Sequence, residues 1–423
     1  MPAQDSQRNT PRLRSARTAG LALFLLASLN LFNFIDRYVL PGVQPLIQSE
    51  FHIDLAQAGT LTSAFFFTYM LIAPLTGWLG DRFPRKPLII AGALLWSAAT
   101  LSTALVHSYT TLLIRHAIVG VGEATFSIFA PALLADFYPE EDRNRVLSIF
   151  YFTIPVGGAL GYVLGGVLGE RYGWRAPFYV AAAPGVLIAV IFWLFVREPQ
   201  RGSADTLQAT HSRASFTGLF SNPAYWSATL GMAMWTFAVG GISAFLPTFF
   251  HNVAHYSLAG ADLTTGEITA VDGLVATIAG GWAAQIWLRH DHRALYYVSA
   301  LSALLAIPFG VLVFFGPMRW LVPGAWLAEF CLFLNTGPLN TAIVNSVSAP
   351  IRATAISVNL FVIHLLGDFP SPHLIGWIAD RHGLRVGLAA TLVSLAASGI
   401  ILIAGARFAP RLPDLEAAKA AHG

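Results

Sequence analysis

The sequence predicts an all-α membrane protein with twelve transmembrane helices in two pseudo-symmetric bundles of six. Three observations predict this fold class. The 423-residue chain is 55% hydrophobic and only 11% charged, whereas about 25% of the residues of soluble domains are charged. Apolar runs of about 20 residues, long enough to cross a bilayer, recur along the whole chain. The longest polar connector divides these runs six and six.

The expected spans follow one another with short loops. They cover residues 18–41, 58–79, 87–107, 110–136, 145–169, 175–196, 224–250, 266–288, 294–315, 320–346, 353–379 and 386–406. We therefore expect an N-terminal bundle over 18–196 and a C-terminal bundle over 224–406. A linker over 197–223 joins them, and tails occupy 1–17 and 407–423.

The distribution of Lys and Arg predicts the orientation. Most basic loop residues fall on the side of the N-terminus, and the opposite side carries only Arg171, Arg175, Arg319, Arg381 and Arg385. Positive charge favours the cytoplasmic side of a membrane, so we expect both termini and the linker in the cytoplasm. Basic loops facing anionic lipid explain the net positive charge, and we expect no nucleic-acid partner. We also expect a monomer.

An internal repeat supports the two halves. Gly166–Arg175 reads GVLGERYGWR, and Gly376–Arg385 reads GWIADRHGLR, an offset of 210 residues. Related halves of this kind are typical of secondary transporters, which bind their substrate where the halves meet.

Several charged residues fall inside the expected spans: Asp36, Arg37, Arg115, Glu123, Glu329 and Asp368. Each costs about 2.5–3.5 kcal/mol at the bilayer centre on insertion scales. We therefore expect them to face one another or an aqueous cavity. Asp36 and Arg37 are adjacent, so on a helix they point about 100° apart and each needs a partner on another span. The pair is either a structural bridge or part of a transport site.

The loop between the second and third spans contains a specific motif. It reads GWLGDRFPRKPLI from Gly77 to Ile89, which resembles the signature of the major facilitator superfamily. The resemblance implies the fold of that superfamily and a cytoplasmic gate built from Gly77, Asp81, Arg82, Arg85, Lys86 and Asp136. The corresponding loop of the second half, GGWAAQIWLRHDHR, lacks the Asp-Arg pair.

Further segments resemble the spinster-like transporters. They are NFIDRY in the first span, VGVGEATFSIFAPALLADFYPEEDRNRVLSIFYF across the fourth and fifth, and GWRAPF after them. Eukaryotic members of that family move lysophospholipids and sphingosine phosphate. The short loops suggest a bacterial inner membrane.

The fourth span carries RHAIVGVGEATF. His116, Gly120 and Glu123 share one helical face. The family usually has an arginine four residues before the first glycine, where this chain has His116, with Arg115 one residue earlier. Either Arg115 or His116 fills that role, and His116 could instead be a neutral residue bonded between helices. In the second half, symmetry suggests that Glu329, Phe237 and Asn335 line a substrate cavity together with Arg37, Arg115 and His116.

These features predict a secondary active transporter that works by alternating access. Asp36 and Glu123 would couple transport to protons, because closing the cavity favours their neutral forms and a nearby cation favours their ionised forms. The substrate would be an anionic or zwitterionic amphiphile such as a lysophospholipid or a sphingoid phosphate. The alternative is a proton-coupled symporter of small organic anions. The sequence shows no catalytic, nucleotide-binding or metal-binding motif, so we expect neither an enzyme nor a cofactor.

Overall fold

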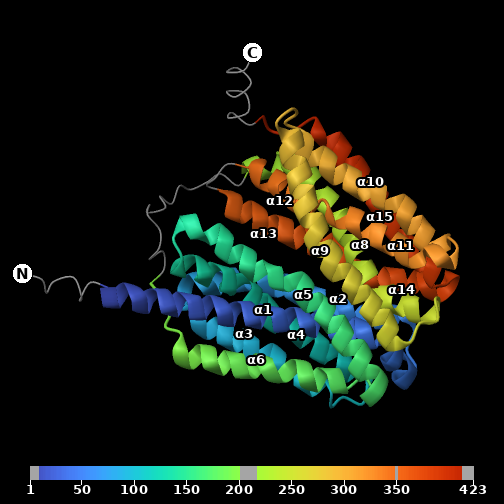
Figure 1. Ribbon diagram of the computed structural model, residues 1–423, viewed down its shortest axis with the longest axis horizontal. Coiled ribbons are helices and arrows are strands. Elements are labelled where there is room, and N and C mark those ends of the chain that lie inside the picture. Colours follow the sequence, from blue (N-terminus) through green and yellow to red (C-terminus); the bar gives the residue numbers. More distant parts are fainter. Residues whose placement is uncertain (1–8, 201–216, 348–350, 412–423) are drawn as a thin grey trace, which may run out of the picture.

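The computed structural model describes residues 9–200, 217–347 and 351–411, and these residues are almost entirely helical (Figure 1). Residues 201–216 of the expected linker, and residues 1–8 and 412–423 of the expected tails, lie outside this part. The first half contains α1 (Asn9–Phe51), α2 (Leu55–Arg82), α3 (Arg85–Thr103), α4 (Tyr109–Phe137), α5 (Glu140–Tyr172) and α6 (Ala176–Phe195).

The second half begins with the short helix α7 (Thr217–Phe220). It continues with α8 (Pro223–Asn252), α9 (Leu258–Leu288), α10 (Ala294–Phe315), the 3-10 turn η1 (Met318–Trp320), α11 (Leu321–Phe333), α12 (Thr336–Asn345), α13 (Arg352–Ile363), the π-helical turn η3 (His364–Asp368), α14 (Pro370–His382) and α15 (Leu384–Ala406). Each half packs around its own apolar clusters.

Eleven helical segments of the described residues are long and apolar enough to cross a membrane. The expected eighth span corresponds to α9, which falls outside this group and carries Asp262, Glu267 and Asp272. The side chains of Ile278 and Trp282 on α9 are nevertheless 73% and 69% exposed, as expected where a helix faces lipid. The chain is a multi-pass membrane protein.

Three expected spans differ in detail from the helices observed. The first span was expected to end at residue 41, and this boundary is wrong, because α1 continues through Pro41 and Pro45 to Phe51. Prolines are tolerated inside membrane helices whose neighbours satisfy the freed backbone groups. The tenth span is divided into α11 and α12. The eleventh changes into the π-helical turn η3 at His364–Asp368.

The internal repeat is confirmed by matching turns. Gly173 and Gly383 follow α5 and α14 with φ values of +83° and +85°, a conformation that glycine adopts without steric cost. Arg175 donates a hydrogen bond to the carbonyl oxygen of Val106 at 2.9 Å, and Arg385 donates one to the carbonyl of Phe314 at 2.5 Å. The two halves therefore share the same local construction at this place.

The two halves contact each other chiefly through α5 against α9 and α2 against α14. Figure 1 shows α14 and the start of α2 on the right, away from the described start of α1 on the left. Two glycines allow the halves to approach closely here. A Cβ atom added to Gly59 would collide with the backbone carbonyl of Pro372, and one added to Gly376 would collide with that of Leu55. We call this end of the molecule, where α2 and α9 begin, the closed end, and the opposite end the terminal end.

Two carboxylates cross between the halves at the closed end. Asp380 of α14 accepts hydrogen bonds from the backbone N–H groups of Leu55 and Ala56, both at 2.9 Å. Glu170 of α5 accepts one from the backbone N–H of Ala259 at 2.8 Å. The first N–H groups of a helix lack intrahelical partners and carry partial positive charge. Each carboxylate therefore caps a helix of the opposite half.

Candidate functional site

Asp36 and Arg37 on α1 point toward different helices of the first half. Arg37 forms an ion pair with Glu123 of α4, with its Nη2 and Nε atoms 2.7 and 3.1 Å from Oε2. Asp36 accepts a hydrogen bond from the hydroxyl of Thr100 on α3. Asp36 is 4% exposed and Glu123 is fully buried. The expectation that each charge finds a partner on another span is confirmed, and neither carboxylate faces lipid.

Aromatic rings surround the guanidinium of Arg37. Its Cζ atom lies 4.6 Å from the ring centre of Phe34, 4.9 Å from that of Phe65 and 5.5 Å from that of Tyr69. Such cation–π contacts fix a cation in place while leaving its N–H groups able to bind an anion. The side chain of Arg37 is 17% exposed and that of Glu123 is fully buried. Arg37 is therefore the member of the ion pair that a ligand can reach.

The structure separates the two candidates on α4. His116 is 6% exposed, and its ring centre lies 5.7 Å from that of Phe65. Arg115 is half-buried, and its side chain makes no ion pair or hydrogen bond with the described residues. His116 thus lies in the layer of Arg37 and Phe65. The cation that binds Glu123 is Arg37, not a residue of α4 itself.

Two aromatic residues of α2 connect Arg37 to the second half. The ring of His364 on η3 stacks on Phe66 at 5.6 Å and meets the edge of Tyr69 at 5.3 Å. His364 Nδ1 lies 2.8 Å from Asp368 Oδ2. A π-helical turn inside an α-helix frequently marks a functional site. The aromatic pair therefore separates the charged groups of the first half from an ionisable pair of the second half.

Glu329 of α11 is 6% exposed and accepts a hydrogen bond from Thr269 of α9 at 3.3 Å. It also interacts electrostatically with Asp272 of α9. Glu329 lines a cavity of about 20 Å³ to which both halves contribute. The lining residues are Tyr38, Tyr162, Val239, Ile242, Ser243, Leu246, Thr269, Glu329, Leu332 and Phe333.

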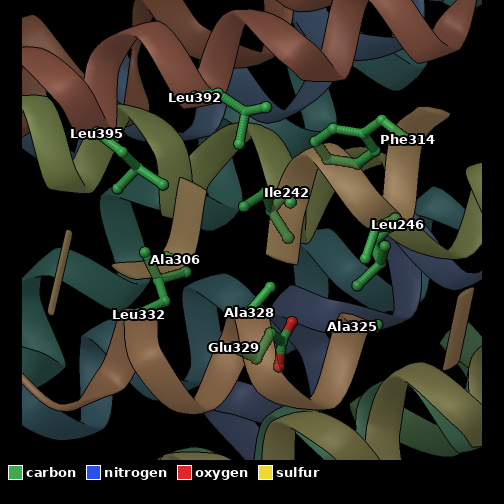
Figure 2. A pocket seen from close by; sticks show the side chains of 12 residues that line it. Ile242, Leu246, Ala306, Phe314, Ala325, Ala328, Glu329, Leu332, Leu392 and Leu395 are labelled. Atoms are coloured by element: carbon green, nitrogen blue, oxygen red, sulfur yellow. The ribbon is translucent and has the colours of Figure 1, made fainter. Parts of the chain in front are cut away.

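A cavity of about 30 Å³ lies inside the second half, between α8, α10, α11 and α15. Figure 2 shows that Glu329 is the carboxylate among the aliphatic and aromatic side chains that line it. Glu329 therefore borders both cavities. Of the two cavities, only the smaller one is lined by described residues of both halves.

The structure places two further candidates of the second half elsewhere. Phe237 is half-buried and packs against an apolar cluster formed by α8, α9, α10, α11, α14 and α15. Asn335 is fully buried in the break between α11 and α12, and its amide atoms have no hydrogen-bond partner among the described residues. Neither residue lines the two cavities described above.

The candidate gate residues at the terminal end contact other residues of the first half. Arg85 forms an ion pair with Asp136 of α4 and donates to the carbonyl of Ala132 at 2.9 Å. Lys86 Nζ donates to the carbonyl of Trp193 on α6 at 2.7 Å. Arg82 is exposed at the end of α2. Gly77 and Asp81 lie on α2, and the surroundings of Gly77 and the side chain of Asp81 are outside what the structure describes.

Sequence reasoning missed two carboxylates in prominent positions. Glu198 accepts hydrogen bonds from the backbone N–H groups of Arg85 and Lys86, at 2.6 and 3.1 Å, and so caps α3. Asp262 is fully buried near the start of α9. The sequence signal for Asp262 was an acidic residue four positions before an expected span. Across residues 9–200, 217–347 and 351–411, no three His, Cys, Asp or Glu side chains gather closely enough to hold a metal ion.

Comparison with known proteins shows which family the chain belongs to. The family model described as Major Facilitator Superfamily matches residues 26–372. The chain is 32% identical over 381 residues to the sphingosine-1-phosphate transporter SPNS2 of Xenopus tropicalis, covering 86% of this chain and 74% of that protein. It is 32% identical over 406 residues to protein spinster homolog 1 of Homo sapiens, covering 90% and 76%.

Solved structures show the same fold. A crystal structure of a bacterial homolog of the human lysosomal transporter spinster, in an inward-facing and unoccupied conformation, matches with a TM-score of 0.84 and 25% identity. The match covers 94% of this chain and 99% of that one. The inward-facing and occupied conformation of such a homolog matches with a TM-score of 0.74, also at 25% identity, covering 91% and 95%.

Proposed function

Since this chain belongs to the spinster family of the Major Facilitator Superfamily, and is therefore a secondary transporter, we propose that it moves an anionic or zwitterionic amphiphile by proton-coupled alternating access. The substrate class is that of lysophospholipids and sphingoid phosphates. The observation that carries the proposal is the ion pair of Arg37 and Glu123, set among aromatic rings on the side of α1 where the halves meet.

The headgroup binds at Arg37 in this proposal. A guanidinium binds phosphate and carboxylate oxygens with two N–H groups at once. Arg37 already binds Glu123 through two N–H groups, so an incoming anion competes with that carboxylate. On the second half, Glu329 and its neighbour Asp272 would meet the ammonium group of a zwitterionic substrate.

The apolar walls favour a lipid tail over a small organic anion. Tyr38, Tyr162, Ile242, Leu332 and Phe333 line the cavity between the halves, and no Lys or Arg among the described residues lines it. A transporter for small organic anions would need a polar cavity with several cationic side chains. The relatives named above as sphingosine-1-phosphate transporters agree with the amphiphile.

Glu123 couples the substrate to protons in this proposal. When an anion takes Arg37, Glu123 is left buried without its counter-ion, which is costly for a charged carboxylate. Proton binding to Glu123 removes that cost, so an anion on Arg37 and a proton on Glu123 stabilise each other by linkage. Asp36, which is buried and accepts a hydrogen bond from Thr100, is the second carboxylate proposed to bind a proton.

The orientation follows from the basic loops. With both termini in the cytoplasm of a bacterial cell, the closed end faces outward. The halves then meet at their outer ends, and the described conformation is inward-facing, as in the bacterial structures that match.

The proposal is tested by flux measurements in proteoliposomes with an imposed pH gradient. Lysophospholipids, sphingoid phosphates and small carboxylates are first screened for binding by ligand-dependent thermal shift. Glu123→Gln and Asp36→Asn are then compared with Glu267→Gln, a change to an exposed carboxylate on α9.

We expect the pH gradient to drive uptake or release in the parent and in Glu267→Gln, and to have no effect in Glu123→Gln. Binding of the amphiphile should strengthen as the pH falls in the parent and in Glu267→Gln, but not in Glu123→Gln. Unchanged gradient-driven flux in both Glu123→Gln and Asp36→Asn would contradict the proposed proton coupling. Flux of small carboxylates without any flux of amphiphiles would show that the substrate is a small organic anion instead.

A further inference from the structure

Asp262 is an isolated carboxyl group enclosed between the two halves at the closed end. It lies on the second turn of α9, and its side chain is fully buried. Neither carboxyl oxygen has a hydrogen-bond partner among the described residues. A methyl group on Gly166 of α5 would lie 2.5 Å from Oδ2, and one on Gly42 of α1 would lie 3.2 Å from Oδ1. Glycines of two first-half helices therefore form the walls around a carboxyl group of the second half.

No cation among the described residues pairs with this group. On α5, Tyr162 interacts electrostatically with Asp262, and its hydroxyl donates to the carbonyl of Ser243 at 2.8 Å. One turn beyond Gly166, Glu170 is occupied as the cap of α9. A tyrosine is neutral near pH 7, and a second carboxylate is repulsive, so neither residue stabilises an ionised Asp262.

In the part of the chain that the structure describes, the other helices packed against α1, α5 and α9 bring no compensating charge to Asp262 either. At the end of α1, Glu50 binds Arg175, with Oε1 2.6 Å from Nη2, so that cation is already paired. At the end of α8, His251 Nδ1 lies 2.8 Å from the carbonyl oxygen of Tyr256. Glu329 of α11 interacts with groups farther along α9. An ionised carboxylate buried without hydrogen bonds or a counter-ion is strongly disfavoured, so the enclosed Asp262 is the protonated acid.

We propose that Asp262 is a proton-binding site that controls the opening of the closed end. Opening separates α9 from α1 and α5, exposes Asp262 to water on that side and releases its proton there. Closing takes one proton back from the same side. The proton therefore returns to the compartment it came from, unlike the proton proposed for Glu123. This inference rests on the proposed alternating access and does not depend on the substrate, on Asp36 or on Glu123.

Linkage gives the sign and the size of the effect. The closed form binds one proton more than the open form, so raising the pH on that side favours opening. The ratio of closed to open molecules should fall by up to about tenfold per pH unit, in the range where exposed Asp262 is ionised and enclosed Asp262 is protonated.

Spin labels across the closed end measure this ratio without substrate. His107 and Arg319 are exposed residues of the loops between α3 and α4 and between α10 and α11. The single cysteine of the full-length chain, Cys331, is first replaced by Ser, and His107 and Arg319 are then changed to Cys. The labelled protein is placed in lipid nanodiscs, and the distance distribution is recorded by double electron–electron resonance between pH 5 and pH 9.

The parent and Glu267→Gln should shift to longer distances as the pH rises. Asp262→Asn, which resembles the protonated acid, should stay at the short distance over the whole range. Asp262→Leu is a second neutral replacement and should behave in the same way, so the test survives if one variant folds poorly.

A pH response in Asp262→Asn or Asp262→Leu as large as that of the parent would overturn the inference, as would a parent with no pH response. The flux test is separate, because Glu123→Gln should keep the distance shift of the parent. If its flux still responds to the pH gradient while the distance shift persists, the proposed coupling at Glu123 fails and the inference stands.

Discussion

Glu170 and Asp380 occupy equivalent positions in the two halves, and each caps the first turn of a helix in the opposite half. They are 210 residues apart in the repeated segments GVLGERYGWR and GWIADRHGLR. Glu170 binds the start of α9, and Asp380 binds the start of α2. The repeat thus produces two related contacts that hold the closed end from both sides.

Neutralising either cap should favour opening of the closed end. Each carboxylate is exposed, and a charge at the N-terminus of a helix contributes about 0.3–1 kcal/mol under such conditions. Glu170→Gln and Asp380→Asn should therefore each lower the ratio of closed to open molecules by about two- to fivefold. The double variant should show the product of both effects, because the sites share no partner. The spin-label distances between positions 107 and 319 measure the ratio.

Arg381→Gln serves as the matched control for the caps. Arg381 neighbours Asp380 but contacts its own helix, donating to the carbonyl of Trp377 at 3.0 Å and lying over that ring. A shift with Arg381→Gln as large as that with Asp380→Asn would show that the caps are not specific.

Adding a methyl group at the glycine contacts of α2 and α14 should force the closed end apart. Gly376→Ala places a Cβ against the carbonyl of Leu55, and Gly59→Ala places one against the carbonyl of Pro372. Backbone atoms cannot move aside as a side chain can, so overpacking should cost about 1–3 kcal/mol in the closed form. We expect longer distances across the closed end at every pH.

Gly281→Ala is the control for these alanine variants. Gly281 lies on α9, and a Cβ there meets no atom within 4 Å. Alanine has the higher helix propensity, so this variant should melt at the same or a slightly higher temperature with unchanged distances. Closed-end distances equal to those of the parent in both Gly59→Ala and Gly376→Ala would contradict the assigned packing.

Removing the charge of Arg37 should weaken binding of anionic amphiphiles, whereas removing that of Arg115 should not. Arg37→Gln also leaves Glu123 buried without its cation. We expect at least a tenfold loss of affinity, since hydrogen bonds to charged groups contribute about 1.5–3 kcal/mol. Arg37→Lys keeps the charge but not the paired N–H groups, so its affinity should lie between those of the parent and of Arg37→Gln. Isothermal titration with the amphiphile found by thermal shift provides the affinities.

Arg115→Gln is the matched control because Arg115 is half-buried and has no hydrogen-bonding partner among the described residues. Its affinity should stay within about threefold of the parent, because the substitution breaks no hydrogen bond or ion pair with the described residues. The opposite ranking of Arg37→Gln and Arg115→Gln would assign the headgroup to α4.

Most of the fold could be predicted from the sequence, because hydropathy and Lys/Arg placement determine spans and topology. The matching glycines Gly173 and Gly383 were visible in the repeat before their φ values were known. The end of α1 could not be predicted, because a proline ends a helix in water but is tolerated among neighbouring membrane helices.

The sequence indicated which residues belong to the site, but not which of them contact each other. Hydropathy and motif singled out Asp36, Arg37 and Glu123, yet the rotation of each helix about its axis decides which of them meet. Asp262 was missed for a related reason. The expected eighth span began at residue 266, so Asp262 was left to a loop, whereas α9 begins at Leu258. Only the glycines on α1 and α5 opposite it reveal the enclosed position.

The caps of Glu170 and Asp380 bind main-chain N–H groups, not side chains. Residues 55, 56 and 259 are therefore free to vary in evolution without loss of these contacts, provided that none becomes proline, which has no N–H to donate. Homologues can thus diverge at the first turns of α2 and α9 and still keep both contacts. An alignment would then show two acidic positions, at residues 170 and 380, and no proline at residues 55, 56 and 259.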